Sequence, residues 1–177
     1  MKLNFITYGK RDGIPNFTNS EILGLYDMME SDGVVDTVFR DGTICSREDF
    51  LQSVVSGYNL LYLVTAGDNP EPAFVCWLNN LNGKMAMMHW SCFSRFWGDC
   101  SDDVGKFAID KLIHMKDMEG RYILDVLIGL IPISNERAID FSQRVGGTLA
   151  AVVPHAAYHA EIDETIDAVL VHYTREA

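Results

Sequence analysis

Hydrophobic and polar residues in the first third of the chain predict one strand followed by two helices. Apolar residues alternate with polar ones over residues 3–8, which is typical of a short strand. They recur at helical spacing over 19–29, and again in the segment that begins at Ser46. Ser46 followed by Asp49 forms an N-capping pattern, and Gly57 is expected to end this second helix.

The middle of the chain predicts three antiparallel strands joined by turns. The strands cover residues 59–66, 73–80 and 84–93. The first turn is GDNPEP, residues 67–72, because its glycine, asparagine and prolines oppose regular structure. The second turn contains an Asn-Gly pair, which is a strong hairpin signal. This part of the chain is therefore expected to form a β-meander.

Apolar spacing in the second half predicts further helices and strands. They are a helix from Ser101 to about Met118, a strand over Arg121–Ile131, a helix over Asn135–Val145 that ends at a Gly-Gly pair, and strands over Thr148–Pro154 and Ala168–Thr174. The first of these helices connects two strands by a crossover, which makes the strands over 84–93 and 121–131 parallel. We therefore expect one α/β domain, residues 1–177, with a mixed sheet.

Composition and charge narrow the classes of function. The chain has 177 residues, 48% of them apolar, which suffices for one domain with a hydrophobic core. Its 14 Lys and Arg against 25 Asp and Glu give a net charge of −11. This excess argues against nucleic acid or an anionic membrane as the main partner, because phosphates would be repelled over most of the surface. It leaves room for a small anionic ligand in a local pocket.

Other sequence features point to a cytoplasmic protein without a metal. The longest apolar stretch, 123–133, contains an aspartate and a proline and is shorter than the ~20 residues of a membrane span. The N-terminus lacks the apolar core of a signal peptide. The four cysteines form no CxxC pair and are expected to stay reduced. His155 and His159 would suit a metal only on a helix, and the surrounding pattern predicts a strand.

The segment Ile131–Gly147 resembles a segment of the GNAT superfamily of acyl-CoA-dependent N-acyltransferases. Its residues Asn135, Ala138, Phe141 and Gly146 stand where GNAT proteins carry an asparagine at a helix start, an alanine, an apolar residue and a terminal glycine. The order of elements extends the resemblance over nearly the whole chain. It implies a GNAT-like fold, with a mixed central sheet of about seven strands and helices on both faces.

The resemblance also implies acetyl-CoA as co-substrate. Its pantetheine would lie between the splayed strands over 84–93 and 121–131, and its pyrophosphate at the N-terminus of the helix between them. A backbone N–H near the end of the first splayed strand would polarise the thioester carbonyl. The residues expected to form this site are Trp90, Ser91, Cys92, Arg95, Gly98, Ser101, Val104, Gly105 and Asn135.

The phosphate loop can be aligned with the family in two ways. An anchor at Val104 and Gly105 places residues 100–103 in the loop, so that two carboxylates face the phosphates. An anchor at Arg95 and Gly98 satisfies the family's Arg-x-x-Gly-x-small pattern but leaves extra residues before the helix. The sequence is compatible with both alignments.

The expected catalytic residues also depart from the family. Many GNAT enzymes carry a tyrosine acid where this chain has Ser142, and an aromatic residue where it has Gly147. His89 is the first candidate for the base that deprotonates the acceptor, and Glu30 and Asp32 are others. The alternative interpretation of His89 is a half-buried strand residue with a structural hydrogen bond.

The sequence therefore predicts an acyl-CoA-dependent N-acetyltransferase that acts on a small-molecule amine or a protein amino group. The acidic balance favours a cationic acceptor. The alternative is a GNAT-fold protein with weakened catalysis that serves as an assembly or interaction module, as in some phage-encoded relatives of the fold. A homodimer is left open, and neither nucleic acid nor a membrane is expected as a partner.

Overall fold

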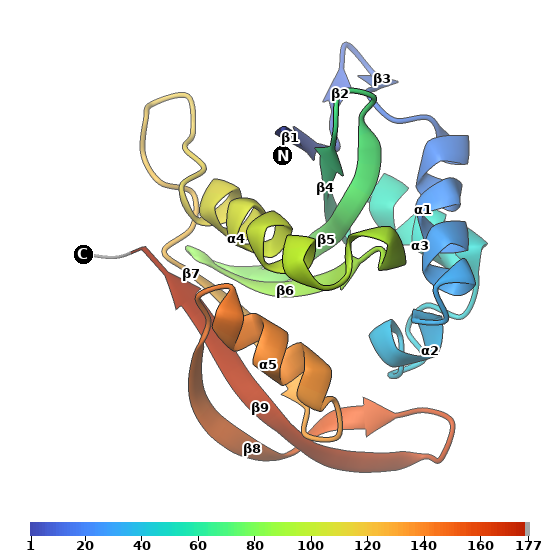
Figure 1. Cartoon of the computed structure of the whole chain (residues 1–177), viewed down its shortest axis with the longest axis vertical. Helices are drawn as coiled ribbons and strands as arrows, with labels where there is room; N and C mark the ends of the chain where they lie inside the picture. Colours follow the sequence, from blue (N-terminus) through green and yellow to red (C-terminus); the bar gives the residue numbers. More distant parts are fainter. Residues whose placement is uncertain (176–177) are drawn as a thin grey trace.

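The computed structural model describes residues 1–175 and contains a seven-stranded sheet in the order β1-β4-β5-β6-β7-β9-β8 (Figure 1). The strands are β1 (Leu3–Thr7), β4 (Leu60–Ala66), β5 (Glu71–Asn82), β6 (Met85–Cys92), β7 (Val126–Pro132), β8 (Thr148–His159) and β9 (Glu164–Thr174). All neighbouring strands pair antiparallel except β6 and β7, which are parallel. The predicted mixed sheet, its meander and its parallel crossover are confirmed.

Helices cover both faces of the sheet. They are α1 (Asn19–Ser31), α2 (Val35–Val38), α3 (Arg47–Val55), α4 (Asp99–Ile113) and α5 (Glu136–Arg144), with a 3₁₀ turn, η1 (Ser94–Phe96). One core cluster joins α4 and α5 to the sheet, and a second joins α1–α3 to its other face. Side chains alternate between them along β5: Phe74 and Cys76 belong to the first cluster, and Val75 and Trp77 to the second. Among the described residues, no helix is long and apolar enough to span a membrane.

Local capping signals account for three helix starts. Thr18 and Glu21 form a reciprocal capping box at α1. The Asp49 N–H donates to Ser46 Oγ at 3.1 Å at the start of α3. At α5, the Ala138 N–H donates to Asn135 Oδ1 at 3.2 Å. These boundaries agree with the prediction because side chain and backbone within one turn determine them.

The start of α4 corrects the prediction. Its N-cap is Gly98, at φ 83°, and Ser101 lies inside the first turn, where its Oγ donates to the Gly98 carbonyl at 2.8 Å. Glycine adopts this left-handed φ without steric cost, so the chain reverses ahead of the predicted cap. The helix also ends at Ile113 rather than near Met118, and a loop follows in which Lys116 bridges to Tyr122.

Several strand boundaries differ as well. β5 begins at Glu71, within the predicted GDNPEP turn, and its pairing with β4 shifts register between Val64 and Thr65. β7 begins only at Val126, and β8 and β9 are longer than expected. No residue of β8 is buried, so the strand carries no alternation of buried and exposed positions to reveal its length. A small hairpin, β2 (Lys10–Arg11) with β3 (Ile14–Pro15), occupies a segment for which the sequence predicts no helix or strand.

Gly105 allows α4 and α5 to pack closely. A Cβ at this position would lie 2.6 Å from Cζ of Phe141 and 2.8 Å from Cγ1 of Val145. We expect Gly105→Ala to lower the free energy of unfolding by about 1–3 kcal/mol through overpacking, measured by urea denaturation. The control is Gly24→Ala in α1, where a Cβ meets nothing within 4 Å and helix propensity should stabilise the protein. A Gly105→Ala variant as stable as the parent would contradict this packing.

Candidate active site

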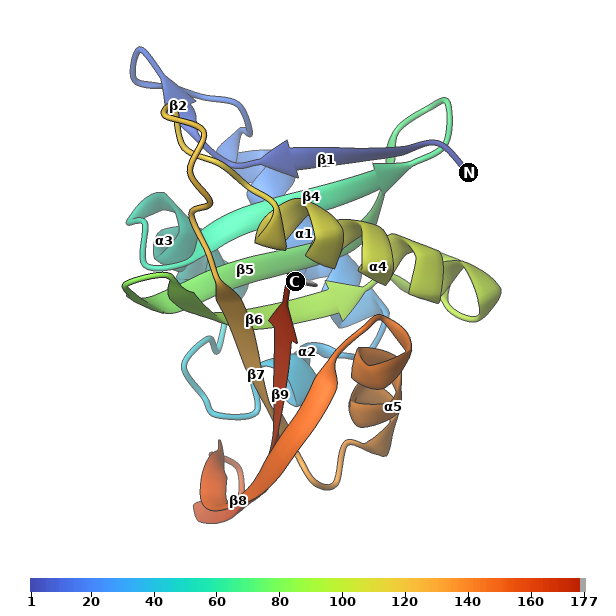
Figure 2. The same cartoon turned by 90° about the vertical axis from the view of Figure 1, so that its left-hand side faces the viewer.

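The central sheet opens between its two parallel strands. β6 and β7 pair only through Met85–Val126, Ala86–Leu127 and Met87–Ile128, whereas β7 goes on pairing with β9 as far as Pro132. Figure 2 shows the result, with β7, β9 and β8 running steeply across the direction of β6 and its neighbours. The backbone of residues 88–92 therefore has no strand partner on its β7 side. The predicted gap between the strands is present.

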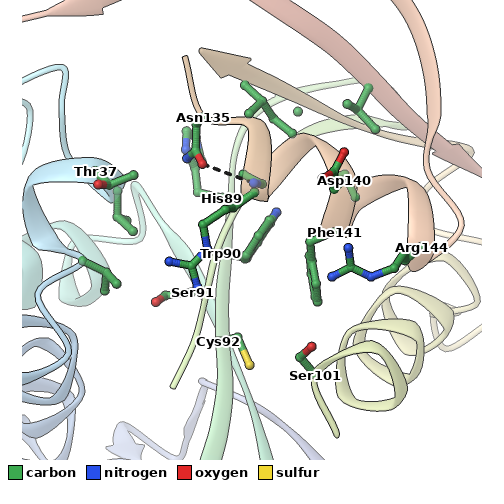
Figure 3. A pocket seen from close by; sticks show the side chains of 18 of the residues that line it. Thr37, His89, Trp90, Ser91, Cys92, Ser101, Asn135, Asp140, Phe141 and Arg144 are labelled. Carbon is green, nitrogen blue, oxygen red and sulfur yellow. Dashed lines mark hydrogen bonds between the residues drawn. The ribbon is translucent and has the colours of Figure 1, made fainter. Parts of the chain in front are cut away.

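A cavity of about 770 Å³ fills this gap and reaches both faces of the sheet. Its lining includes residues from α2, β6, the start of α4, β7 and α5 (Figure 3). Of the residues predicted for the site, the ones that line it are His89, Trp90, Ser91, Cys92, Gly98, Ser101, Asn135 and Ser142. Segments distant in sequence thus meet around one space.

Three other predicted residues lie elsewhere. Arg95 is exposed and forms an ion pair with Glu71, beside a separate pocket of about 330 Å³. Val104 is fully buried in the core, and Gly105 packs against Phe141. None of the three lines the large cavity: Arg95 lies in η1, and Val104 and Gly105 lie in the second turn of α4.

The side chains of β6 divide between the two faces of the sheet. Trp90 faces α5, where its ring lies 4.6 Å from that of Phe141 between centroids. Cys92 is buried on the same face, and burial raises the pKa of its thiol to about 12. His89 faces the side of α1–α3 and stacks on Trp77, with centroids 5.7 Å apart and planes at 6°. The cavity therefore has two chemically different ends.

Two arginines of α5 line the cavity near the N-terminus of α4. Arg144 of α5 donates from Nε to both carboxylate oxygens of Asp102, at 3.1 and 3.0 Å. Arg137, also from α5, lies over the Trp97 ring at 5.2 Å from its centroid and lines the same cavity. Asp103 is exposed and lies outside the cavity lining. Of the two carboxylates that one alignment places in the phosphate loop, Asp102 lines the cavity and is paired with Arg144, and Asp103 lies outside the lining.

The first turn of α4 itself offers backbone donors. The first N–H groups of an α-helix have no partner within the helix, and here they follow directly on Gly98 at the cavity edge. Residues 100–103 are already helical, whereas Arg95 lies in η1 and Gly98 is the N-cap of α4. The Trp97 indole N–H donates to the Cys92 carbonyl at 2.7 Å and holds this segment against β6.

The candidate bases differ in their surroundings. His89 lines the cavity, its Nε2 lies 3.2 Å from Asn79 Oδ1, and burial lowers its pKa, with Asp41 opposing weakly. Asp32 also lines the cavity, but its carboxylate accepts hydrogen bonds from the Ser94 backbone N–H, at 2.7 Å, and from the Ser94 hydroxyl. Glu30 is exposed and lies outside the lining.

Two buried hydroxyl groups lie at the α5 end of the cavity. Ser142 is fully buried, and its Oγ makes no hydrogen bond of normal geometry within residues 1–175. The Tyr173 hydroxyl lies near it: burial raises the pKa of Tyr173, and Ser142 has a smaller opposing effect. Gly147 makes this approach possible, because a Cβ there would lie 2.9 Å from Cε1 of Tyr173. The ring of Tyr173 from β9 thus lies beside Ser142 and Gly147, the two positions at which the sequence departs from the GNAT pattern.

Sequence reasoning missed Tyr173, Trp97, Arg137 and Arg144. Tyr173 alternates with Val169 and Val171 in the last strand, which could have indicated a buried position. Its proximity to Ser142 could not be inferred, because the pairing order of the strands decides it. The two arginines share one face of α5 at a spacing of seven residues, which is a usable signal for a basic helix face.

Comparison with known proteins supports the fold. No family model matches the chain, and no curated protein matches it. Similar solved structures include a GNAT-family acetyltransferase from Bacillus anthracis (12% identity, TM-score 0.70, 98% of this chain and 95% of that chain). They also include the microcin C7 self-immunity acetyltransferase MccE in complex with acetyl-CoA and AMP (15% identity, TM-score 0.68, 89% of this chain and 89% of that chain). A third is spermidine N-acetyltransferase from Vibrio cholerae in complex with CoA and spermine (8% identity, TM-score 0.68, 97% of this chain and 95% of that chain). The chain therefore has the fold of the GNAT acetyltransferases.

Proposed function

We propose that this protein is an acyl-CoA-dependent N-acetyltransferase whose co-substrate, acetyl-CoA, lies in the gap between β6 and β7. The observation that carries the proposal is the loss of pairing beyond Met87 and Ile128, which leaves strand backbone facing an open cavity. An extended arm with amide groups can hydrogen-bond to such a free strand edge. Two solved structures of this fold hold acetyl-CoA or CoA.

The residues around the cavity fit such a co-substrate. The α4 N-terminus after Gly98 offers backbone donors to a pyrophosphate group. Arg137 and Arg144 add positive charge from α5. Asn135 lines the cavity, and its Oδ1 accepts from the Ala138 N–H, so its Nδ2 can donate to an amide oxygen of the pantetheine arm. Donors thus predominate where the co-substrate carries acceptor oxygens.

The proposed catalytic residues transfer protons from the amine of the acceptor. His89 accepts one proton from the acceptor ammonium and later releases it to solvent. The freed amine forms a C–N bond with the acetyl carbonyl carbon while the C–S bond of the thioester, which acetyl-CoA supplies, breaks. Backbone N–H groups around residues 90–92 stabilise charge on the carbonyl oxygen. The second proton leaves the amine nitrogen and reaches the departing thiolate through the hydroxyls of Ser142 and Tyr173.

The acceptor proposed is a small amine or a protein amino group that carries positive charge. The net charge of −11 favours the approach of a cation. The α1–α2 side of the cavity, where His89 lies, is the side from which the acceptor reaches the thioester. The neighbour solved with spermine is a precedent for a polyamine in this fold.

A direct assay tests the proposed function. The protein is incubated with acetyl-CoA and a panel of polyamines, amino-sugar amines and N-terminal peptides, and both CoA and acetylated products are measured by mass spectrometry. A thiol reagent is unsuitable because Cys45 and Cys100 are exposed free thiols. Formation of CoA together with one acetylated amine is the expected result. Absence of both CoA and an acetylated amine across the panel, at millimolar acetyl-CoA, would contradict the proposed enzyme function.

The ion pair between Asp102 and Arg144 allows a finer prediction about the phosphate end. Asp102→Asn removes a negative charge beside the α4 N-terminus and frees Arg144 for a phosphate group. We expect the variant to bind CoA up to about fivefold more tightly at low salt, with the gain shrinking as ionic strength rises. Asp103→Asn is the matched control, since Asp103 lies outside the cavity lining. Weaker binding by Asp102→Asn would show that this end does not receive the phosphates.

One observation favours the alternative function of an interaction module. The outer strand β8 exposes large apolar side chains, with Leu149 at 37%, Val152 at 53% and Tyr158 at 41% exposure. Light scattering after size-exclusion chromatography, combined with CoA titration, separates the two functions. A monomer that binds CoA tightly would exclude the function of an interaction module. Self-association without CoA affinity would support that function.

A further inference from the structure

We propose that three polar side chains beneath His89, namely Ser53, Asn59 and Asn79, fix the protonation pattern of its imidazole so that Nδ1 is the nitrogen that accepts the proton of the acceptor. Asn79 contacts the ring, and Asn59 and Ser53 act through Asn79, so all three are positioning residues. The role of Nδ1 as a base rests on the proposed function; the protonation pattern itself does not.

The hydrogen bonds of these side chains form one continuous chain. Ser53 Oγ lies 2.7 Å from the Phe50 carbonyl oxygen of α3. Asn59 Nδ2 lies 3.0 Å from Ser53 Oγ, and Asn79 Nδ2 lies 3.1 Å from Asn59 Oδ1. His89 Nε2 lies 3.2 Å from Asn79 Oδ1. Asn59 and Asn79 are 3% and 8% exposed, so water does not compete for these bonds.

A backbone carbonyl at one end sets the direction of the whole chain. The Phe50 carbonyl can only accept, so the Ser53 hydroxyl must donate to it and accept from the Asn59 amide group. The Asn59 oxygen then faces Asn79 and accepts from its amide group. The oxygen of Asn79 is therefore the atom that faces the imidazole. This assignment needs no assumption about the histidine.

The direction of the chain decides which ring nitrogen carries the hydrogen. An amide oxygen accepts only, so Nε2 of His89 must donate to it. In the neutral imidazole the lone pair is then on Nδ1, which makes no hydrogen bond within the described part of the chain. Stacking on Trp77, with planes at 6°, holds the ring plane that this bond requires. Protonation of Nδ1 leaves the bond to Asn79 intact, so the same support serves both states of the base.

The location of His89 agrees with this role. Its side chain lies on the α1–α3 face of the sheet, whereas the α4 N-terminus and the pair of Asp102 with Arg144 lie on the opposite face. Asp41, from the loop after α2, is the charged group that acts on its pKa, and the charged side chains that line the same cavity are Asp32, Asp102, Arg137, Asp140 and Arg144. Burial lowers the pKa of His89 and exceeds the effect of Asp41, so the neutral, proton-accepting form predominates at neutral pH.

Nitrogen-15 NMR of the histidine rings tests the inference without any assay of activity. Two-bond couplings in ¹⁵N-histidine-labelled protein tell the Nε2–H form from the Nδ1–H form, and His89→Gln assigns the signals among the five histidines. We expect His89 to be in the Nε2–H form. Asn79→Leu removes the acceptor and should produce a mixture of both forms. Asn79→Asp keeps an acceptor oxygen, so it should retain the Nε2–H form and raise the pKa of His89 through its charge.

The control is Asn4→Leu, the same exchange on β1, where the side chain has only a 3.5 Å contact with Thr65. Circular dichroism establishes that each variant is folded. If the unmodified protein is active, Asn79→Leu should lower kcat by about tenfold or more with the KM for acetyl-CoA unchanged. Asn79→Asp should recover most of the rate and shift the acid limb of the pH profile upward.

Two results would overturn the inference. The first is an Nδ1–H form of His89 in the unmodified protein. The second is an Nε2–H form that persists in folded Asn79→Leu, since Asn79 would then not determine the form. Failure of the unmodified protein to bind CoA is a different result: it would overturn the proposed function, and with it the base role of Nδ1, whereas the NMR spectra still decide on the protonation pattern.

Discussion

Replacing Gly129 with leucine is expected to abolish CoA binding while the protein remains folded. Gly129 lies on β7 directly beyond the last pair with β6, and it lines the cavity. A Cβ at this position meets only the Met88 carbonyl oxygen, at 3.9 Å, so a side chain extends into the gap without striking the backbone. Alternation along β7 directs it toward α5, into the space proposed for pantetheine.

The expected loss of affinity is large because the side chain and the co-substrate compete for the same volume. We expect the Kd for CoA to rise about 100-fold or more, measured by calorimetry. The unfolding temperature should stay within about 4 °C of the parent. Gly24→Leu in α1, where a Cβ also meets open space, is the matched control and should bind CoA normally. A Gly129→Leu protein that binds CoA as the parent does would place the co-substrate outside this gap.

Replacing His89 with glutamine is expected to lower the rate of acetyl transfer by about 100-fold or more without weakening CoA binding. The glutamine amide can donate to Asn79 Oδ1 as Nε2–H does, so the buried hydrogen bond is kept while the titratable nitrogen is lost. The measurement is kcat and KM with the best amine from the panel. A variant with the parent's rate at pH 7.5 would show that another group deprotonates the acceptor.

The pH profile gives a second readout of the same residue. His89 must be neutral to accept a proton, and burial places its pKa below the ordinary value of 6.5. Activity of the parent should therefore be constant across neutral pH and fall as the pH drops through this lowered pKa. The glutamine variant should lack that acid limb. The same limb in both proteins would assign it to another group.

Features set by one turn of chain were predictable from the sequence, and features set by tertiary contacts were not. The caps at Thr18, Ser46 and Asn135 join residues three positions apart, so local pattern suffices. The start of α4 was misplaced because Ser101 and the following aspartates imitate a cap. The reversal at Gly98 instead follows from the loop that Trp97 ties to Cys92.

The same distinction applies to the site. Apolar spacing reveals the strand–helix–strand crossover, whereas the gap between β6 and β7 was expected from the resemblance to the GNAT superfamily. Arg144 and Asp102 are 42 residues apart in the sequence, and Asn79 and Asn59 are 20 residues apart. A local sequence pattern therefore cannot predict either contact. The sequence alone could therefore place acidic residues near the phosphate end, but not show that one of them is paired.

Calorimetric titration of the unmodified protein with acetyl-CoA is the most direct test of the proposed co-substrate site. We expect one binding site per chain with a Kd in the micromolar range, about −8 kcal/mol. Added salt should weaken this binding, because the proposed site brings phosphate oxygens to Arg137, Arg144 and the α4 N-terminus. Absence of binding heat at millimolar acetyl-CoA, confirmed by an unchanged unfolding temperature, would contradict it.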